Sequence, residues 1–140
     1  MDAPAAEGSS PDRQTILIVD DEVALGKMLC LIFRREGFQV HYAIDGSQAI
    51  DLYRRHRVAI DLVLMDVRMP GQDGVQTLAA LQELDPDVRC CFMSGETGRH
   101  TIPELLAKGA IDVLLKPFCD LQELKRQVWK MVIAVSEPGA

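Results

Sequence analysis

Four short, almost wholly apolar runs stand out along the chain, and each has the length of a β-strand. A strand that is apolar on both sides must be covered on both sides, as in a parallel sheet enclosed by helices. A fifth run mixes polar and apolar residues, which predicts an edge strand with one wetter face. The four apolar runs are Ile16–Val19, Leu62–Met65, Cys90–Met93 and Val113–Leu115, and the mixed run is Phe38–Ala43.

Helical patterns fill the intervals between these runs. The first helix places apolar residues on one face and ends at Gly37; the last opens with Asp120 and Glu123, a variant of the capping box. Three more helices are marked by Ala49–Tyr53, Val75–Leu81 and Pro103–Gly109. The β-α unit therefore occurs five times. With right-handed crossovers and the mixed strand at an edge, we predict a flavodoxin-like (βα)5 doubly wound parallel sheet with strand order 2-1-3-4-5.

Polar residues gather where the predicted strands end. Ligands of such a sheet bind beyond the carboxyl ends of its strands, near the point where the strand order reverses. The first predicted strand ends in Asp20 and Asp21, the third in Asp66, the fourth in Ser94 and the fifth in Lys116. The fold would therefore bring three carboxylates, a hydroxyl and an ammonium to one rim.

Each of these groups suits phosphoryl transfer to an aspartate. Crowded carboxylates repel one another unless a cation joins them, and an all-oxygen set suits Mg²⁺. Asp66, at the end of the central strand, could attack phosphorus and form an aspartyl phosphate. Lys116 would pair with one phosphoryl oxygen, and the Ser94 hydroxyl could donate to another.

The overall charge and the cysteines limit the classes of function. A formal net charge of −6 disfavours direct nucleic-acid binding by this domain. The chain shows neither an apolar run long enough for a bilayer nor a signal peptide, so we expect a cytoplasmic protein without a membrane segment. The four cysteines have no metal-like spacing and are interpreted as small hydrophobic residues. Residues 1–13 are expected to be a flexible tail, residues 14–135 the folded domain, and residues 136–140 a tail or the start of a linker.

Four segments of the chain resemble the signature set of response-regulator receiver domains, similar to chemotaxis regulators. They are Ile16–Glu22, Leu62–Gly74, Met93–Gly95 and Leu115–Phe118, and the resemblance runs from about Thr15 to Val135. Any one segment is a weak signal, but all of them occur in order and each lies at a predicted strand end. The resemblance implies a signalling switch of a two-component system or phosphorelay, which promotes its own phosphorylation and dephosphorylation.

The resemblance also assigns roles to individual residues. It implies that Asp66 is the phosphoacceptor, that Asp21 and Asp66 bind Mg²⁺ directly, and that Asp20 binds it through water. The backbone carbonyl of Arg68 would complete the protein ligands. Ser94 would be the switch hydroxyl and Lys116 the cation that pairs with phosphate, with a cis bond before Pro117.

Partners and output follow from the same resemblance. A histidine kinase or phosphotransfer protein would donate the phosphoryl group, and the output would be a downstream protein target or an output domain absent from this chain. The moving face would comprise the fourth helix, fifth strand and fifth helix, through which a dimer could form. Val113 stands where receivers often carry Tyr or Phe, so a smaller rearrangement or another surface would carry the signal. Arg68 and Glu96 could shield the phosphoryl group from water.

Other interpretations compete with these. Asp20 and Asp21 could merely cap the first helix, and Ser94 could be a turn residue. A small Mg²⁺-dependent phosphatase would usually need an acid at the position of Arg68. Trp129 could belong to the core or to a partner surface. The scattered histidines, His41, His56 and His100, are expected to have surface or structural roles.

Overall fold

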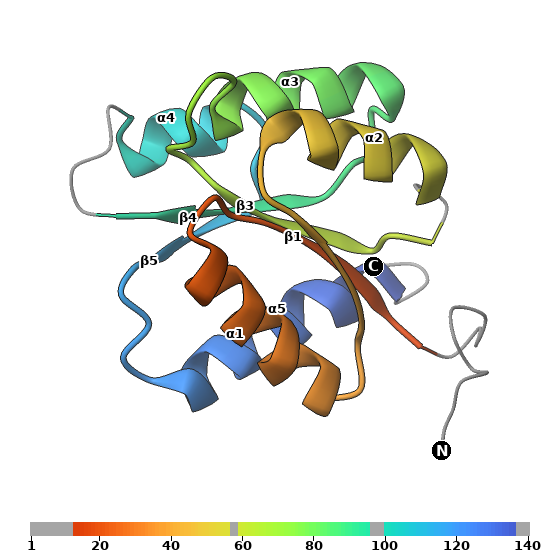
Figure 1. The fold of residues 1–140 in the computed structure, drawn as a ribbon, viewed down its shortest axis with the longest axis vertical. Helices are drawn as coiled ribbons and strands as arrows, with labels where there is room; N and C mark the ends of the chain where they lie inside the picture. Colours follow the sequence, from red (N-terminus) through yellow and green to blue (C-terminus); the bar gives the residue numbers. More distant parts are fainter. Residues whose placement is uncertain (1–12, 57–58, 96–99, 137–140) are drawn as a thin grey trace.

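The computed structural model describes residues 13–56, 59–95 and 100–136, and the side chains of 134–136 are not described. Within these residues, strands and helices alternate strictly along the chain, as Figure 1 shows. The predicted domain of residues 14–135 covers this folded part, but the predicted tails lie almost wholly outside the described residues. The domain boundaries therefore stay predictions.

The strands form one parallel sheet in the order β2-β1-β3-β4-β5, so the predicted flavodoxin-like topology is confirmed. The register pairs Val19 with both Ala43 and Met65, so these strands end close to one another. The strands are β1 (Thr15–Val19), β2 (Gln39–Ala43), β3 (Leu62–Asp66), β4 (Cys90–Ser94) and β5 (Asp112–Leu115).

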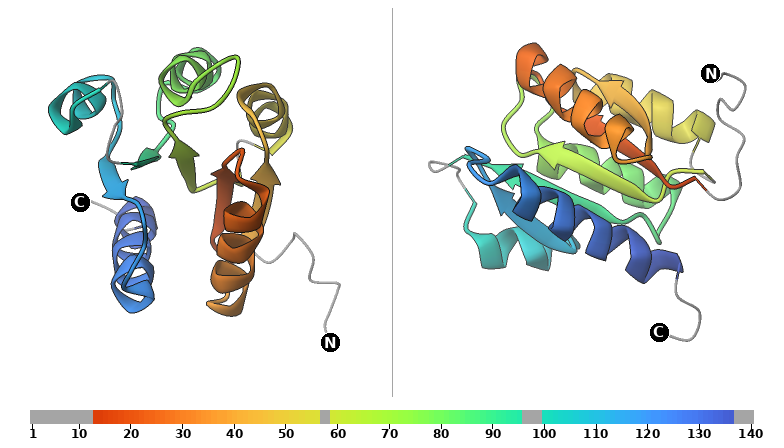
Figure 2. Two further views of the ribbon diagram at one scale, coloured as in Figure 1. Left: turned by 60° about the vertical axis from the view of Figure 1, so that its left-hand side comes forward. Right: turned by 90° about the horizontal axis from the view of Figure 1, so that it is seen from below.

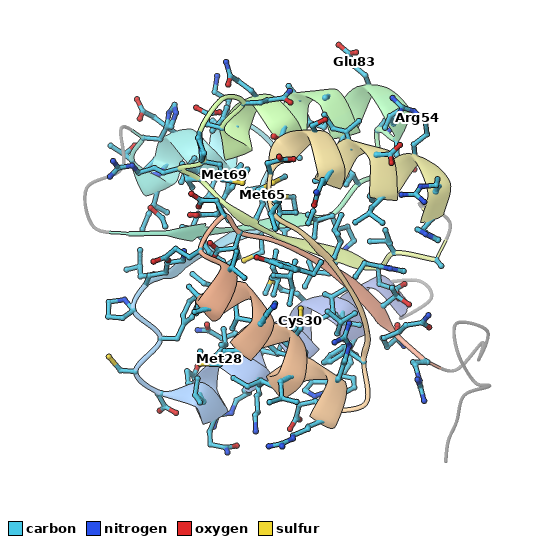
Figure 3. All side chains as sticks on the ribbon, in the orientation of Figure 1. Met28, Cys30, Arg54, Met65, Met69 and Glu83 are labelled. Carbon is cyan, nitrogen blue, oxygen red and sulfur yellow. The ribbon has the colours of Figure 1, made fainter. Side chains whose placement is uncertain are left out.

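Helices cover both faces of the sheet, as the left view of Figure 2 shows. One buried cluster lies between the sheet and α2–α4, and a second lies between the sheet and α1 with α5. In Figure 3, Met65 and Met69 lie towards the first of these layers, whereas Cys30 comes from α1 in the second. The helices are α1 (Val23–Arg35), α2 (Gly46–His56), α3 (Gly74–Leu84), α4 (Ile102–Ala107) and α5 (Leu121–Ser136).

Local polar contacts fix where the helices begin. Asp73 and Gln76 form a full capping box at α3, and Thr101 and Glu104 form another at α4. The predicted cap at α5 is present, since the backbone N–H of Glu123 donates to an Asp120 carboxylate oxygen at 3.0 Å. These contacts satisfy N–H groups that have no partner within a helix.

The fifth strand differs from its prediction. Its apolar sequence predicted cover on both sides, but only Leu114 is buried, and Leu115 is 58% exposed. The strand lies at the sheet edge, and α4, its neighbour on one face, has only six residues. The face of β5 that carries Val113 and Leu115 is therefore only partly covered. The mixed strand β2 lies at the other edge, as predicted.

Three of the four cysteines are buried and without disulfide bonds, as their apolar surroundings predicted. Burial raises the pKa of the Cys30, Cys90 and Cys91 thiols. Cys119, which follows β5, is exposed. No helix in the described residues combines the length and apolarity that crossing a bilayer requires.

Two aromatic contacts join elements that are distant in sequence. The ring of Trp129 packs against Phe38 at 4.2 Å, and its indole N–H donates to Glu36 at 3.2 Å. Trp129 is therefore partly buried against the cluster that includes α1 and α5, as the core interpretation expected, while its role in a partner surface stays a prediction. The rings of His41 and His56 stack at 4.5 Å, so these two histidines are not scattered in space.

Candidate functional site

Three acidic side chains converge at the carboxyl ends of β1 and β3. Asp20 and Asp21 follow β1 directly, and Asp66 is the last residue of the central strand β3. Among the described residues, carboxylate oxygens of these three side chains lie within 4.8 Å of one another. Asp20 and Asp66 are buried, whereas Asp21 is exposed at the mouth of the site. The parallel topology thus produces the cluster of acids that the sequence predicted.

The ammonium group of Lys116 lies among these acids. Its Nζ is 3.0 Å from Asp20 Oδ2 and 3.5 Å from Asp66 Oδ1. It is also 3.5 Å from Glu22 Oε1, a contact that the sequence interpretation did not assign. Burial alone would lower the pKa of Lys116, but the bond to Asp20 and the nearby carboxylates raise it above its ordinary value. One cation therefore faces several acids, and the site keeps an excess of negative charge.

The buried position of Asp66 strongly shifts the pKa of its carboxyl group. Burial is the first cause that raises its pKa, and the charges of Asp20 and Asp21 raise it further, while Lys116 lowers it. The result is a pKa of about 7 for a carboxyl group whose ordinary value is 3.8. A divalent cation would replace the bound proton and relieve the repulsion.

The backbone around Asp66 is closely packed. Gly74, the first residue of α3, donates its N–H to the Val67 carbonyl at 2.8 Å. A Cβ atom on Gly74 would lie 2.2 Å from the carbonyl oxygen of Asp66. Only glycine therefore fits at this position without a shift of the end of β3.

The carboxylate of Asp20 is engaged in the site rather than in a helix cap. Its Oδ1 accepts the backbone N–H of Glu22 at 2.8 Å, and its Oδ2 accepts from Lys116 at 3.0 Å. Glu22 itself occupies the N-cap position of α1 without a capping bond from its side chain. The N-cap position of α1 is therefore held by Glu22 and not by Asp20 or Asp21.

The Ser94 hydroxyl is buried at the end of β4 and donates to the Gly95 carbonyl at 2.9 Å. The Ser94 carbonyl also accepts the backbone N–H of Lys116 at 2.9 Å, which ties the ends of β4 and β5 together. The hydroxyl thus makes a turn contact here, and rotation about one side-chain bond would redirect it. The bond between Lys116 and Pro117 is cis, as the resemblance implied.

An open cavity of about 880 Å³ lies over the acid cluster. Its lining includes Asp21, Asp66, Arg68 and Lys116, which the sequence had selected. It also includes residues that the sequence interpretation missed, namely Asp73, Gln76 and His100. The capping box at α3 could have signalled the first two, but no pattern marks His100. Glu96, the proposed partner of Arg68, lies outside the described residues.

Comparisons with known proteins agree with this architecture. The response regulator receiver domain family matches residues 16–128 of the chain. Sporulation initiation phosphotransferase F of Bacillus subtilis is 35% identical over 118 residues, which cover 84% of this chain and 93% of that protein. The regulatory protein AtoC of Escherichia coli is 38% identical over 109 residues, 78% of this chain but only 23% of AtoC.

Solved structures give the same result. The chain is similar to one in the CheX–CheY–BeF3–Mg²⁺ complex of Borrelia burgdorferi, with a TM-score of 0.77 and 34% identity over 84% of this chain and 87% of that one. A receiver domain protein of Clostridium thermocellum has a TM-score of 0.80 at 21% identity, covering 86% of this chain and 95% of that one, and this likeness concerns the fold.

Proposed function

This chain belongs to the response regulator receiver family, whose members are phosphorylated on aspartate in two-component signalling, and on that premise we propose that Asp66 is its phosphoacceptor. The observation that carries the proposal is the position of Asp66. It lies at the end of the central strand, buried beside two other carboxylates and 3.5 Å from the Lys116 ammonium. A carboxylate in this acid cluster needs more positive charge than Lys116 alone provides, and a bound divalent cation would supply it.

We propose that a phosphohistidine of a histidine kinase or phosphotransfer protein is the donor. A carboxylate oxygen of Asp66 would form the new bond to phosphorus while the bond from phosphorus to the donor imidazole breaks. The imidazole nitrogen would keep the electron pair and later take a proton. Lys116, already held by Asp20, would neutralise one phosphoryl oxygen, and a rotated Ser94 hydroxyl would donate to another.

Receiver domains bind Mg²⁺ in an acidic pocket, and the acid cluster here offers the oxygen donors that this ion prefers. We propose that Asp21, Asp66 and the Arg68 carbonyl hold it directly and that Asp20 holds it through water. When bound, the ion would offset the charge that develops on the transferred group. Asp20 is already engaged by Lys116 and by the Glu22 N–H, which favours the indirect role.

The decisive experiment is phosphorylation with acetyl phosphate and Mg²⁺, measured by intact mass. We expect one added phosphoryl group on the wild type and none on Asp66→Ala. Asp51→Ala is the matched control, since Asp51 lies on α2 and forms an exposed ion pair with Arg55. Phosphorylation of Asp66→Ala to the wild-type level would contradict the assignment. Repeated turnover of a phosphomonoester would favour the phosphatase alternative instead.

We propose that the output face comprises α4, β5 and α5, through which the phosphorylated protein would bind a partner or a second copy. Three exposed apolar side chains support this proposal, namely Ile102, Leu106 and Leu115. Val113, in place of an aromatic ring, is partly buried against the cluster beside α4. The signal would therefore pass through a displacement of β5 and α4 rather than through rotation of a ring.

The wider context of the chain is also a proposal. The chain spans nearly the whole of the Bacillus phosphotransferase but about half or less of several DNA-binding relatives, such as MtrA of Mycobacterium tuberculosis, of which it covers 45%. Direct contact with nucleic acid is not expected from this domain, because its net charge is −6. A cytoplasmic location remains a prediction from the sequence.

A further inference from the structure

The end of the edge strand β2 holds both backbone groups of Asp20. The Tyr42 hydroxyl donates to the main-chain carbonyl oxygen of Asp20 at 2.8 Å. The N–H of Asp20 donates in turn to the carbonyl of Ala43 at 3.1 Å. Two neighbouring residues of β2 therefore hydrogen-bond the main chain of Asp20, although they lie more than twenty positions away in sequence.

The hydrogen bond from Tyr42 to Asp20 also affects the orientation of Asp21, the next residue. The carbonyl of Asp20 belongs to the peptide unit that leads into Asp21, and a peptide unit is planar. Fixing this oxygen therefore fixes the direction in which the chain enters Asp21. The Asp20 carboxylate is fixed separately by Glu22 and Lys116. The Tyr42 contact thus orients the peptide plane before Asp21.

Gly26 of α1 has no side chain and so leaves room for the ring of Tyr42. A Cβ atom on Gly26 would lie 2.4 Å from Tyr42 Cε1 and 2.6 Å from its hydroxyl oxygen. The phenol ring thus occupies space that any other residue at position 26 would fill. Burial, followed by the charge of Asp20, raises the pKa of Tyr42, so the hydroxyl remains a proton donor.

We propose that Tyr42 is a positioning residue of the acid cluster, whose hydroxyl orients the Asp20–Asp21 peptide and thereby sets the affinity of the site for Mg²⁺. The inference rests on the proposed function, because it takes the acid cluster to be the Mg²⁺ site. Tyr42 acts through Asp20 and does not contact the phosphoryl group. Its removal should therefore weaken binding of the ion but leave the chemistry intact once the site is saturated.

The test compares Tyr42→Phe with Tyr53→Phe. Each variant loses one tyrosine hydroxyl bond, and the bond of Tyr53 runs to Asp85 at 2.7 Å, a contact between α2 and the end of α3. Mg²⁺ binding is measured by calorimetry, and labelling by acetyl phosphate is measured at limiting and at saturating Mg²⁺. We expect Tyr42→Phe to raise the dissociation constant for Mg²⁺ by about three- to tenfold. We expect Tyr53→Phe to leave it unchanged.

The rate of labelling by acetyl phosphate distinguishes a loss of Mg²⁺ affinity from general destabilisation of the fold. Tyr42→Phe should be labelled more slowly than wild type at limiting Mg²⁺ and at the wild-type rate at saturation. Equal Mg²⁺ constants for wild type and Tyr42→Phe would overturn the proposal, even if the variant melted at a lower temperature. Wild-type protein that bound no Mg²⁺ would instead refute the proposed function.

Gly26→Ala is a second variant that should disrupt the hydrogen bond between Tyr42 and Asp20. The added methyl group would displace the Tyr42 ring, so this variant should also bind Mg²⁺ more weakly. In a Tyr42→Phe background the hydroxyl is already lost, and Gly26→Ala should add little further loss of affinity. Full additivity of the two effects would count against the proposed route through the hydroxyl.

Discussion

At the scale of single residues, the buried carboxylate of Asp66 is the main source of instability in the site. Its pKa of about 7 means that the folded chain, free of divalent cations, binds a proton which the unfolded chain would release near 3.8. Stability from this group is therefore present in acid and is lost as the pH rises through about 7. The ionised form of Asp66 therefore strains the folded chain above about pH 7.

Asp66→Asn should relieve this strain. The amide has the shape of the carboxylate without its charge, so we expect the variant to melt a few degrees above wild type at pH 8 in a chelator. The gap should narrow at pH 5, where Asp66 of the wild type is protonated. Thermal melts at both pH values measure this, and identical melting of the two proteins at pH 8 would contradict the expectation.

Lys116→Met should have the opposite effect. It leaves the fully buried Asp20 without its ammonium partner, a change that costs about 3 kcal/mol in comparable buried pairs. Lys125→Met is a matched control, because the Lys125–Glu36 pair is more exposed and should cost less than about 1 kcal/mol. Urea denaturation would measure both losses, and Mg²⁺ should recover part of the first. Equal losses in the two variants would show that the site charges are not coupled as described.

These residues also show what a sequence can predict about a site. Asp20, Asp21, Asp66 and Lys116 meet because parallel strands place their carboxyl ends at one rim, which the order of elements is enough to predict. The bond of Tyr42 to Asp20 and the orientation of the Ser94 hydroxyl were not predictable in this way. They depend on side-chain packing between distant elements, for which the sequence carries no periodic signal.

At the scale of elements, the two edge strands differ in how well their sequences describe them. The polar mixture of β2 predicted a partly solvated edge strand, and its residues are only partly buried except for Val40 and Ala43. The apolar sequence of β5 predicted full cover, yet the short helix α4 leaves Leu115 exposed. Exposed apolar side chains that form one patch are typical of an interaction surface.

Leu115→Glu tests the proposed output face. Since Leu115 is largely exposed, the change should not lower the melting temperature by more than a degree or so. We expect it to abolish any self-association that beryllofluoride and Mg²⁺ induce in the wild type, as measured by analytical ultracentrifugation. Leu31→Glu, at an exposed position of α1, should assemble as the wild type does. Assembly of Leu115→Glu at the wild-type level would rule out a dimer through this face.

At the scale of the whole molecule, Asp66 and His41 make stability depend on pH in opposite directions near neutrality. Burial, the neighbouring His56, and the charges of Arg34 and Arg55 lower the pKa of His41. A folded protein that disfavours the protonated imidazole is most stable above the ordinary histidine value of 6.5 and loses stability as the pH falls below it. This trend is the reverse of the one from Asp66.

His41→Gln should remove the histidine contribution. We expect the melting temperature of the variant to fall less, or to rise more, than that of wild type as the pH is lowered from 7.5 to 5.5, because the unfavourable protonation beside α1 and α2 is gone. His100→Gln, a change in the loop before α4, should change as the wild type does. If His41→Gln also changed in parallel with the wild type, the stacked pair would not govern the acid response.

The overall architecture was the most predictable property of the chain. Its apolar runs and intervening helical patterns were sufficient for the topology, because a sheet covered on both faces leaves few other arrangements. What the sequence could not supply was how completely each face is covered, since that depends on helix length and placement. The exposed side of β5 and the stacked histidines at the β2 edge are both of this kind.

The distribution of the cysteines offers a practical route to watching this molecule work. Cys119 is the exposed thiol of the four, while Cys30, Cys90 and Cys91 are buried and resist ionisation. A maleimide dye should therefore attach to the native sequence at one place, without any engineered cysteine. That place lies three residues after Lys116, so its fluorescence could follow activation in real time.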